Sequence, residues 1–574
     1  MKKVFGFLKP YRLQCVLAPL FKMLEATFEL LVPVVVASII DRGIGEGDTP
    51  HVLRMCGILA LLAVVGYASA VTAQYFASVA AMGFSAATRL ALFKKVQSLS
   101  YTELDTLGTA TIVARMTSDV AQAQTGVNIT LRLLLRSPFV VFGAMIGAAL
   151  IDGKTALTFG GVILLLMVAV FAIMYFTVPL YRKSQNKLDR VLDLTRENLL
   201  GVRVIRAFCM EEGETKSFDE ANTALTRAHK RVGLISALTN PVTYVLINLG
   251  IIALLYTGAV EVNVGNLTQG QVIALYNYMS QILVELVKFA NLIVTVTKSV
   301  ASGKRIEQML NMTSSMEEVD TLPTPIPDAP AIAFENVALT YAGSQEPALD
   351  GVTFTLAKGG VLGVIGGTGS GKSTLVNLIP RFYDATEGSV RIAGVDVKAY
   401  PLDALRDRIG VVPQKATLFA GTIRDNLKWG NPNATDEELW DALRLAQAVD
   451  VVESKPKGLD EWVEAGGRNF SGGQRQRLTI ARALVRKPDI LILDDSASAL
   501  DYATDAALRR SLKGLTDTSV VVVSQRASSV RHADLTIVLD DGMVVGMGTH
   551  EELLHTCPVY QEICSSQEKG GDEA

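Results

Sequence analysis

The sequence is poor in charged residues and in cysteine for its length. Only 19% of its 574 residues are charged, and 54 basic residues against 57 acidic residues give a net charge of −3. This balance leaves no overall basic surface for nucleic acid, so no nucleic-acid partner is expected. The five cysteines are scattered without metal-ligand spacing, which favours free thiols in a reducing environment over a disulfide framework. The opening residues MKKVFGFLKPYR lack an apolar stretch followed by a small-residue cleavage site, so no removable signal peptide is expected.

Apolar residues, in contrast, are abundant, at 49% of the chain, which is more than an ordinary soluble protein contains. They gather in the first half in stretches long enough for the roughly 20 residues that a helix needs to cross a bilayer. We place six spans near Leu13–Ile40, Val52–Phe84, Leu131–Ile151, Ala156–Leu180, Thr239–Val260 and Gln269–Val300. Six such stretches in series predict a helical domain in a lipid bilayer over residues 1–312, and not a set of buried soluble helices.

Basic residues are distributed unevenly between the two sides of these spans. The connections after the first, third and fifth spans contain only Arg42 and Lys154, whereas the opposite connections are rich in lysine and arginine. Because such residues accumulate on the cytoplasmic side, both termini and the second half of the chain are expected to be cytoplasmic. The chain is therefore predicted to be a multi-pass protein of the cell (plasma or inner) membrane.

The two long cytoplasmic connections, residues 85–130 and 181–238, lack clusters of proline or glycine. We therefore expect their flanking helices to continue beyond the bilayer. Their tips, near residues 107–120 and 201–212, are amphipathic enough to lie across a partner surface. The alternative is that both tips are solvated turns.

Polar residues inside the predicted spans are few, and such residues usually face a cavity or pair with one another. Lys22, Glu25 and Glu29 fall on one face of the first span, and Glu285 and Lys288 fall on one face of the sixth. The candidates for a translocation path are Glu25, Glu29, Asn248, Asn277, Gln281, Glu285 and Lys288. The alternative is that the charged residues form ion pairs that hold the helices together.

The pattern changes after a segment rich in Glu, Thr and Pro, which we assign as a linker over residues 313–330. From residue 331 to 574, short β-branched runs alternate with helical segments: VLGVIG, VRIAG, IGVVP, ILILDD, SVVVVS and LTIVLD. This alternation predicts an α/β domain with a largely parallel sheet.

One of these strands runs directly into a glycine-rich loop. The segment GGTGSGKS satisfies the phosphate-binding pattern and lies between the strand VLGVI and a helix, so its backbone amides can surround the phosphates of ATP. The predicted loop residues are Gly366, Gly367, Thr368, Gly369, Ser370, Gly371, Lys372, Ser373 and Thr374. Lys372 is expected to reach the terminal phosphates, while Ser373 and, through water, Asp494 at the end of LILD are expected to hold Mg²⁺.

Farther along, RNFSGGQRQR contains a more specific motif. With this motif, the whole chain resembles the ATP-binding cassette (ABC) exporters. In these proteins, six membrane helices are fused to one nucleotide-binding domain, which has the α/β P-loop NTPase fold. The motif residues are Phe470, Ser471, Gly472, Gly473 and Gln474. The resemblance implies that this signature completes the ATP site of a second cassette, and that the cytoplasmic tips are coupling helices.

The same resemblance assigns roles to other positions. Tyr341 is similar to the aromatic residue that stacks on adenine, and Gln414 is similar to the glutamine that contacts Mg²⁺ and the γ-phosphate. The segment SALD is similar to the loop that crosses between two cassettes, and it comprises Ser498, Ala499, Leu500 and Asp501. The implied cofactors are ATP and Mg²⁺.

Two positions depart from the family pattern in the same chemical step. Asp495 stands where the family has a glutamate that polarises the attacking water, and Gln525 stands where it has a histidine that contacts the γ-phosphate. The Asp495 carboxylate is one methylene shorter, and an amide cannot share a proton as an imidazole can. The chain is therefore predicted to bind nucleotide well and to cleave it poorly.

This pair of substitutions favours a heterodimer with a second, non-identical half-transporter, because a homodimer would repeat the weak site twice. The predicted activity is ATP-driven efflux of small amphipathic compounds. The alternatives are a homodimeric exporter or lipid flippase with slow ATPase, and an ATP-gated membrane channel or sensor. The sequence does not specify which compound is transported.

Overall fold

The structure, a computed structural model, describes residues 2–496 and 499–569. The chain divides into two compact units, the first made of Met1–Gln97 and Ala110–Met312 and the second of Ser98–Thr109 and Thr313–Ala574. The short segment Ser98–Thr109 thus belongs with the second unit although it lies within the first half of the sequence.

The first unit is helical throughout its regular structure. Its elements are α1 (Lys2–Gly6), η1 (Lys9–Tyr11), α2 (Arg12–Ser38), η2 (Ile39–Ile44), α3 (Thr49–Gln97), α5 (Thr109–Ala114), η3 (Arg115–Asp119), α6 (Val120–Leu133), α7 (Arg136–Ile151), α8 (Gly153–Ala207), α9 (Glu211–Ala237), α10 (Thr239–Val264) and α11 (Gln269–Asn311). Within the described residues, six helical segments are long and apolar enough to cross a membrane. They are Lys9–Ile44, Thr49–Gln97, Thr109–Ile151, Leu157–Ala207, Glu211–Val264 and Gln269–Asn311. The six predicted spans are confirmed, and most of these segments run well past the predicted ends.

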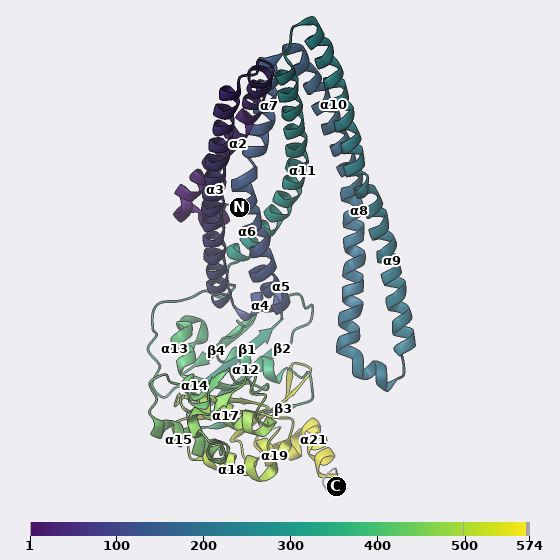
Figure 1. Ribbon diagram of the computed structural model, residues 1–574. Coiled ribbons are helices and arrows are strands. Elements are labelled where there is room, and N and C mark those ends of the chain that lie inside the picture. The colour runs from purple at the N-terminus through teal and green to yellow at the C-terminus, as the bar shows by residue number, and fades with distance from the viewer. Residues whose placement is uncertain (1, 497–498, 570–574) are drawn as a thin grey trace. The chain divides into compact units, whose positions relative to one another are not determined.

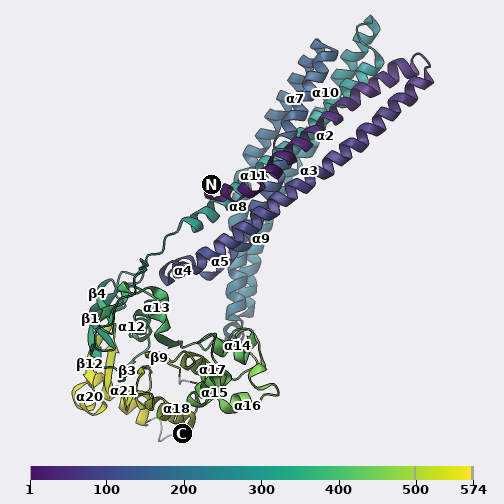
Figure 2. The same cartoon turned by 90° about the vertical axis from the view of Figure 1, so that its left-hand side faces the viewer.

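Small residues let the membrane helices approach one another closely. Ala73, Ala77 and Ala80 recur along one face of α3 and are fully buried, as are Ala18 and Ala26 on α2. Alanine at such positions brings backbones together where lipid supplies no hydrophobic driving force between helices. The helices α8 and α9 form a long hairpin that is visible in Figures 1 and 2.

The turn between α10 and α11 has clear local causes. Gly265 ends α10 in the left-handed region, at φ 84°, a conformation that glycine adopts without steric cost. Thr268 then caps α11, because its side-chain oxygen accepts a hydrogen bond from the backbone N–H of Gln271.

The second unit is built on β-sheets. Its strands are β1 (Ile332–Leu339), β2 (Leu349–Leu356), β3 (Val361–Gly366), β4 (Glu387–Ile392), β5 (Val395–Asp396), β6 (Ile409–Val412), β7 (Gly421–Thr422), β8 (Trp462–Val463), β9 (Ile490–Asp494), β10 (Ser519–Val523), β11 (Leu535–Asp540) and β12 (Met543–Gly548). In the described part of the chain, one sheet has the order β12-β11-β3-β10-β9-β6, in which the last five strands run parallel and β12 pairs antiparallel with β11.

A second sheet is antiparallel, with the order β2-β1-β4-β5. The run VRIAG, which we assigned to the parallel sheet, lies in this second sheet within β4 and the turn that follows it. Its pattern of apolar residues does not distinguish the two sheets, because both bury β-branched side chains. The predicted α/β domain with a largely parallel sheet is confirmed within the described residues, and the antiparallel sheet is the part that was not predicted.

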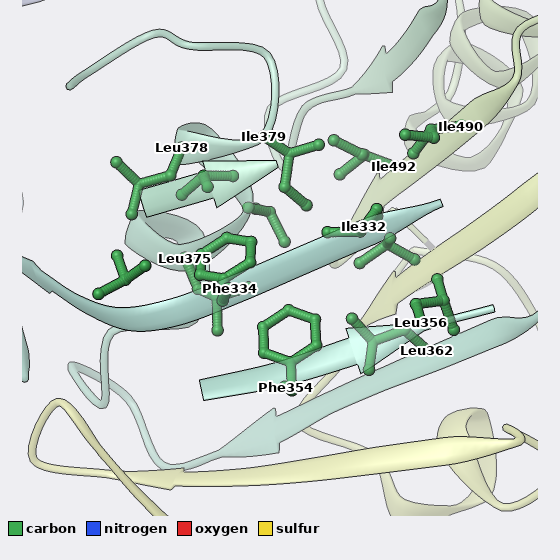
Figure 3. Packing of buried hydrophobic residues seen from close by; sticks show 14 of the residues in the cluster. Ile332, Phe334, Phe354, Leu356, Leu362, Leu375, Leu378, Ile379, Ile490 and Ile492 are labelled. Atoms are coloured by element: carbon green, nitrogen blue, oxygen red, sulfur yellow. The ribbon is translucent and has the colours of Figure 1, made fainter. Parts of the chain in front are cut away.

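Helices complete the second unit. They are α4 (Tyr101–Leu107), α12 (Lys372–Leu378), η4 (Val397–Ala399), α13 (Leu402–Asp407), α14 (Ile423–Lys428), α15 (Asp436–Leu445), α16 (Val449–Glu453), η5 (Gly458–Asp460), α17 (Gly472–Leu484), α18 (Tyr502–Lys513), α19 (Ala527–Val530), α20 (His550–Thr556) and α21 (Pro558–Lys569). Figure 3 shows the core between the two larger sheets, where the Phe334 and Phe354 rings stack at 4.6 Å and Leu375 of α12 packs nearby. This core fixes the start of α12 beside the end of β3.

Helix α4 was not predicted from the sequence, which placed the first cytoplasmic tip near residues 107–120. The segment that joins the second unit is Ser98–Thr109, whereas most of the predicted tip, from Ala110 onward, belongs to the first unit. Ser100 and Glu103 form a capping box at the start of α4. The second predicted tip contains the turn between α8 and α9, where Phe208 is 74% exposed.

Candidate functional site

The glycine-rich loop connects the end of β3 to the start of α12. Gly369 and Gly371 have φ values of +85° and +94°, in the left-handed region that favours glycine. A Cβ on Gly371 would also come within 2.8 Å of the Ala348 carbonyl oxygen. Gly367, Thr368 and Gly369 are exposed, so the loop presents its backbone to an incoming anion.

Lys372 is buried beneath this loop and folds back on it. Its Nζ donates hydrogen bonds to the carbonyl oxygens of Gly366, at 3.0 Å, and of Gly367, and to Ser370 Oγ at 3.3 Å. Burial lowers the pKa of the Lys372 ammonium, and the nearby carboxylates of Asp495 and Asp494 oppose this effect. A buried ammonium whose partners are neutral oxygens fits a site for a polyanion such as a triphosphate.

Two oxygen donors meet beside Lys372. Ser373 Oγ, at the start of α12, lies 3.3 Å from Asp494 Oδ1, at the end of β9. Burial raises the pKa of Asp494, and the Asp495 charge adds to the effect, while the Ser373 hydroxyl and Lys372 lower it. A hydroxyl and a carboxylate are the kind of oxygen ligands that Mg²⁺ takes together with phosphate. These residues therefore fit a nucleotide-bound Mg²⁺.

Asp495 follows directly and is held by its neighbours. Its backbone is left-handed at φ 46°, and its N–H donates to the Val523 carbonyl oxygen at 3.0 Å. Burial raises the pKa of Asp495, while a side-chain hydrogen bond with Gln414 and the charges of Arg526 and Lys372 act in the opposite direction. The structure therefore brings Gln414 into contact with Asp495.

Gln525 lies on the loop after β10 and is exposed. The backbone carbonyl oxygen of Gln525 accepts a hydrogen bond from Gln567 Nε2 of α21 at 2.8 Å. Asp495 and Gln525 line one groove together with Arg526, whose guanidinium lies 5.5 Å from the centre of the Tyr502 ring. Arg526 was missed by the sequence analysis, although a cation directly after Gln525 was a usable signal.

The signature residues begin helix α17. Ser471 Oγ accepts from the Gln474 backbone N–H at 3.3 Å, and Gln474 Oε1 accepts from the Ser471 N–H at 3.0 Å, so the two side chains cap the helix. Phe470 is buried, while Ser471 is exposed at the helix N-terminus. Gly472 and Gly473 follow in the first turn, where the absence of side chains leaves the backbone amides open.

The predicted inter-cassette loop is tied to this helix. The Ala499 N–H donates to Gln476 Oε1 of α17 at 3.2 Å, and Leu500 is buried. Asp501 caps α18, because its Oδ1 accepts from the Thr504 N–H at 2.9 Å. Ser498 lies outside the described residues.

Tyr341 lies after β1, next to the glycine-rich loop. Its hydroxyl donates to Thr374 Oγ1 of α12 at 3.1 Å. Its ring meets the Tyr383 ring edge to face, with centroids 5.1 Å apart and planes at 89°. Tyr383 was not predicted from the sequence, because the segment RFYD matches no phosphate-binding pattern.

Three of the charged candidates, Glu29, Glu285 and Lys288, lie in one cluster of ion pairs with Arg136, which was not predicted as a candidate. Arg136 of α7 lies 2.5 Å from both Glu29 of α2 and Glu285 of α11, and Lys288 lies 2.9 Å from Glu285.

Three of the remaining candidates of the predicted path form hydrogen bonds or ion pairs that the structure shows. Gln281 donates to the Glu29 carbonyl oxygen at 3.3 Å, Glu25 pairs with Lys22 at 2.5 Å, and Asn248 donates to the Tyr244 carbonyl oxygen at 2.7 Å. Asn277 is half-buried on α11. The structure thus brings Glu29 of α2 together with Gln281, Glu285 and Lys288 of α11. Asn248 lies on α10, which contributes no residue to this group.

The α/β unit contains a P-loop, a strand that ends in an aspartate and a signature helix capped by a serine. In the same chain, the described residues include six apolar helices that are long enough to span a membrane. Together these features define a membrane transporter with an ATP-binding cassette. The family described as the ABC transporter transmembrane region matches residues 15–286, and the ABC transporter family matches residues 349–498. The chain belongs to the ABC transporter family. It is an exporter-type half-transporter, with a membrane region and a cassette that couple ATP to transport.

Relatives and a solved structure agree with this assignment. The "Uncharacterized ABC transporter ATP-binding protein Rv1273c" of Mycobacterium tuberculosis is 36% identical over 570 residues, covering 98% of this chain and 97% of its own. The "Probable multidrug resistance ABC transporter ATP-binding/permease protein YheI" of Bacillus subtilis is 30% identical over 577 residues, covering 99% and 97%. The structure of a bacterial Atm1-family ABC exporter with ATP bound matches the fold with a TM-score of 0.78 at 24% identity, covering 97% of this chain and 98% of that one.

Proposed function

We propose that this chain is one subunit of a heterodimeric exporter, that its own nucleotide site binds ATP but hydrolyses it poorly, and that its signature completes the active site of a non-identical partner. The observation that carries the proposal is the pair Asp495 and Gln525 beside a complete set of phosphate-binding groups. Both substitutions affect the step in which the attacking water is activated, whereas the glycine-rich loop, Lys372 and Ser373, which would bind the phosphates, keep the family pattern.

The nucleotide would be held by groups that the site already orients. The loop amides and Lys372 would bind the phosphates, and Tyr341 would receive the adenine ring. Ser373, Gln414 and, through water, Asp494 would hold Mg²⁺, which neutralises phosphate charge when bound. Gln414 would thus have to serve both the metal and Asp495, with which it hydrogen-bonds here.

Asp495 is poorly suited to act as a general base. Its carboxylate is one methylene shorter than that of glutamate, it sits on a left-handed backbone at φ 46°, and Gln414 engages it. General-base assistance contributes about 10²–10⁴-fold, so a carboxylate out of reach of water forfeits roughly 3–5 kcal/mol of barrier lowering. Gln525 can donate a hydrogen bond but cannot share a proton, so it does not restore the lost step.

The signature is intact by comparison. Exposed Ser471 and the free amides of Gly472 and Gly473 at the start of α17 provide donors for the γ-phosphate of a nucleotide on another cassette. A partner with glutamate and histidine at its own positions would then have a complete catalytic site. One site would turn over while the other stays occupied.

Two further observations support the proposed substrate and the proposed orientation of the chain in the membrane. The Bacillus subtilis relative is named as a probable multidrug resistance transporter, which supports drug-like compounds as cargo, and we propose that these are small and amphipathic. The excess of lysine and arginine on one side of the spans supports a cytoplasmic cassette and cytoplasmic termini, in the plasma or inner membrane. A homodimeric exporter, a slow lipid flippase and an ATP-gated channel are the outcomes to be distinguished by experiment.

The test is a comparison of binding and turnover by the purified wild-type chain in nanodiscs. Fluorescent trinitrophenyl-ATP should bind, and K372A should abolish the binding, whereas release of phosphate by the chain alone should be slow. The matched control is K457A, which removes an exposed lysine between α16 and η5, outside the groove that Asp495 and Gln525 line. Rapid, sustained phosphate release by the wild-type chain alone would contradict the heterodimer proposal.

A further inference from the structure

Tyr383 lies between helix α4 and the tyrosine beside the phosphate loop. On one side, its hydroxyl donates to Asp105 Oδ2 of α4 at 2.5 Å, and its ring lies 6.0 Å from the Tyr101 ring of the same helix. On the other side, its ring packs edge to face against Tyr341 at 5.1 Å. A single side chain therefore touches both α4 and Tyr341.

The contacts continue from Tyr341 to the phosphate-binding helix. The Tyr341 hydroxyl donates to Thr374 Oγ1, two residues after Lys372. Asp105, Tyr383, Tyr341 and Thr374 thus form a continuous series of hydrogen bonds and one ring contact. Helix α4 follows α3 and precedes α5 in the chain, so one end of this series is covalently continuous with the membrane helices.

The loop that carries Tyr383 is held firmly. Arg381 is only 2% exposed and forms an ion pair with Asp384 at 2.7 Å. It also donates to the Glu317 carbonyl oxygen of the linker at 3.1 Å. The loop is therefore fixed on both sides of Tyr383, so a displacement of the Tyr341 ring would act on the Tyr383 ring with little adjustment of the backbone.

The Tyr383 hydroxyl is a dependable donor to α4. Burial and the Asp105 carboxylate raise the pKa of Tyr383 above its usual range, so the phenol stays protonated. A short hydrogen bond from a hydroxyl to a carboxylate is among the stronger kinds in proteins. The Tyr101 ring adds a second contact by packing on Phe382 at 4.8 Å.

We propose that Tyr383 is a positioning residue that couples occupation of the Tyr341 ring by a nucleotide base to the placement of helix α4. This inference rests on the proposed function, in which Tyr341 receives the adenine ring. A base stacked on Tyr341 restricts that ring, which orders Tyr383 and strengthens its hydrogen bond to Asp105. A ligand that offers phosphates without a base fills the glycine-rich loop but leaves Tyr341 and α4 less restrained.

The test compares ATP with inorganic tripolyphosphate, both with Mg²⁺, on the full-length protein in nanodiscs. Hydrogen–deuterium exchange is followed in the amides of residues 101–107. In the wild type, ATP should slow this exchange by about tenfold more than saturating tripolyphosphate does, which is the factor expected for one charge-assisted hydrogen bond. Y383F, which keeps the ring and removes the hydroxyl, should lose most of this difference while its affinity for ATP stays within about threefold of wild type.

Further variants separate coupling from general loss of structure. D105A removes the acceptor and should reproduce Y383F, whereas D105N retains a side-chain oxygen and should behave more like the wild type. Y400F is the matched control, because it removes another tyrosine hydroxyl of this unit, one that donates to the Ile392 carbonyl oxygen at 3.1 Å. Y400F should keep the full difference between ATP and tripolyphosphate.

Two results would overturn the proposal in distinguishable ways. If Y383F and D105A bind ATP and retain the full ATP-dependent protection of α4, Tyr383 does not couple the two sites and the proposed function stands. If the wild-type chain fails to bind ATP at all, the proposed function and this inference both fail.

Discussion

Arg136 of α7 forms a buried ion pair with Glu285 of α11, at 2.5 Å, and the two side chains are only 7% and 4% exposed. Ser137 donates a further hydrogen bond to Glu285 at 2.9 Å. The same guanidinium reaches Glu29 of α2. Three helices are therefore held together by one cation inside the membrane unit, which favours the ion-pair interpretation for these candidates over a free polar path.

The first prediction concerns this ion pair. R136A leaves the buried Glu285 carboxylate without its main cation, and removing one partner of a buried pair typically costs about 3–5 kcal/mol. The thermal midpoint of the nanodisc-embedded protein should fall markedly. K288A is the control, because the Lys288 side chain is 48% exposed and its pair should contribute less than about 1 kcal/mol. Equal midpoints for R136A and K288A would show that the cluster does not hold the helices.

A second prediction separates the role of Ser471 as the cap of α17 from its proposed role in the ATP site of a partner cassette. S471A removes a helix cap, which should cost about 1 kcal/mol of cassette stability. T435A removes the equivalent cap of α15, where Thr435 also forms a capping box, and serves as the matched control.

Both variants should lower the thermal midpoint to a similar extent, but only S471A should slow ATP hydrolysis by the assembled transporter. The expected loss is on the order of 10²-fold, as for removal of one donor to a developing charge. Equal hydrolysis by S471A and T435A would mean that this signature does not complete an active site.

A third prediction concerns the pH dependence of stability that arises from Glu103, which binds Ser315 from helix α4. Burial disfavours the charged form of Glu103, but hydrogen bonds from Ser100 and Ser315 outweigh it and hold the pKa of Glu103 below its usual range. A carboxylate with a lowered folded-state pKa stabilises the fold above its unfolded pKa of about 4.3, and this contribution is lost as the pH falls through the folded pKa.

The comparison is between wild type and E103Q. Their thermal midpoints should differ at neutral pH and should converge as the pH falls below about 4. E46Q, in an exposed turn of the membrane unit, is the control and should show no such convergence. A wild-type advantage that is constant across this range would contradict a role for ionised Glu103.

The sequence was sufficient for the elements whose signal is local. Six apolar stretches predicted six spans, and β-branched runs predicted five strands of the parallel part of one sheet correctly, within the described residues. The glycine-rich loop could be placed at a strand end because its pattern and its flanking elements are contiguous. Asp495 and Gln525 could be singled out as departures because each follows a recognisable strand.

Other features depend on contacts between distant residues. Arg136 lies inside the predicted span Leu131–Ile151, but its partners come from helices more than 100 positions away in the sequence. Helix α4 was not predicted, because the amphipathic pattern near residues 107–120 does not reveal that the preceding turn packs against Phe382 and Tyr383. Such pairings are determined by tertiary packing, and the periodicity of apolar residues in the sequence does not predict them.

The measurement that tests the central claim most directly is the rate of ATP hydrolysis by the purified chain alone, as wild type and as the double variant D495E/Q525H. If the site binds ATP and lacks only water activation, the double variant should hydrolyse ATP about 10²-fold or more faster than the wild type, at similar ATP affinity. A wild-type chain that already hydrolyses ATP as fast as the double variant would contradict the account.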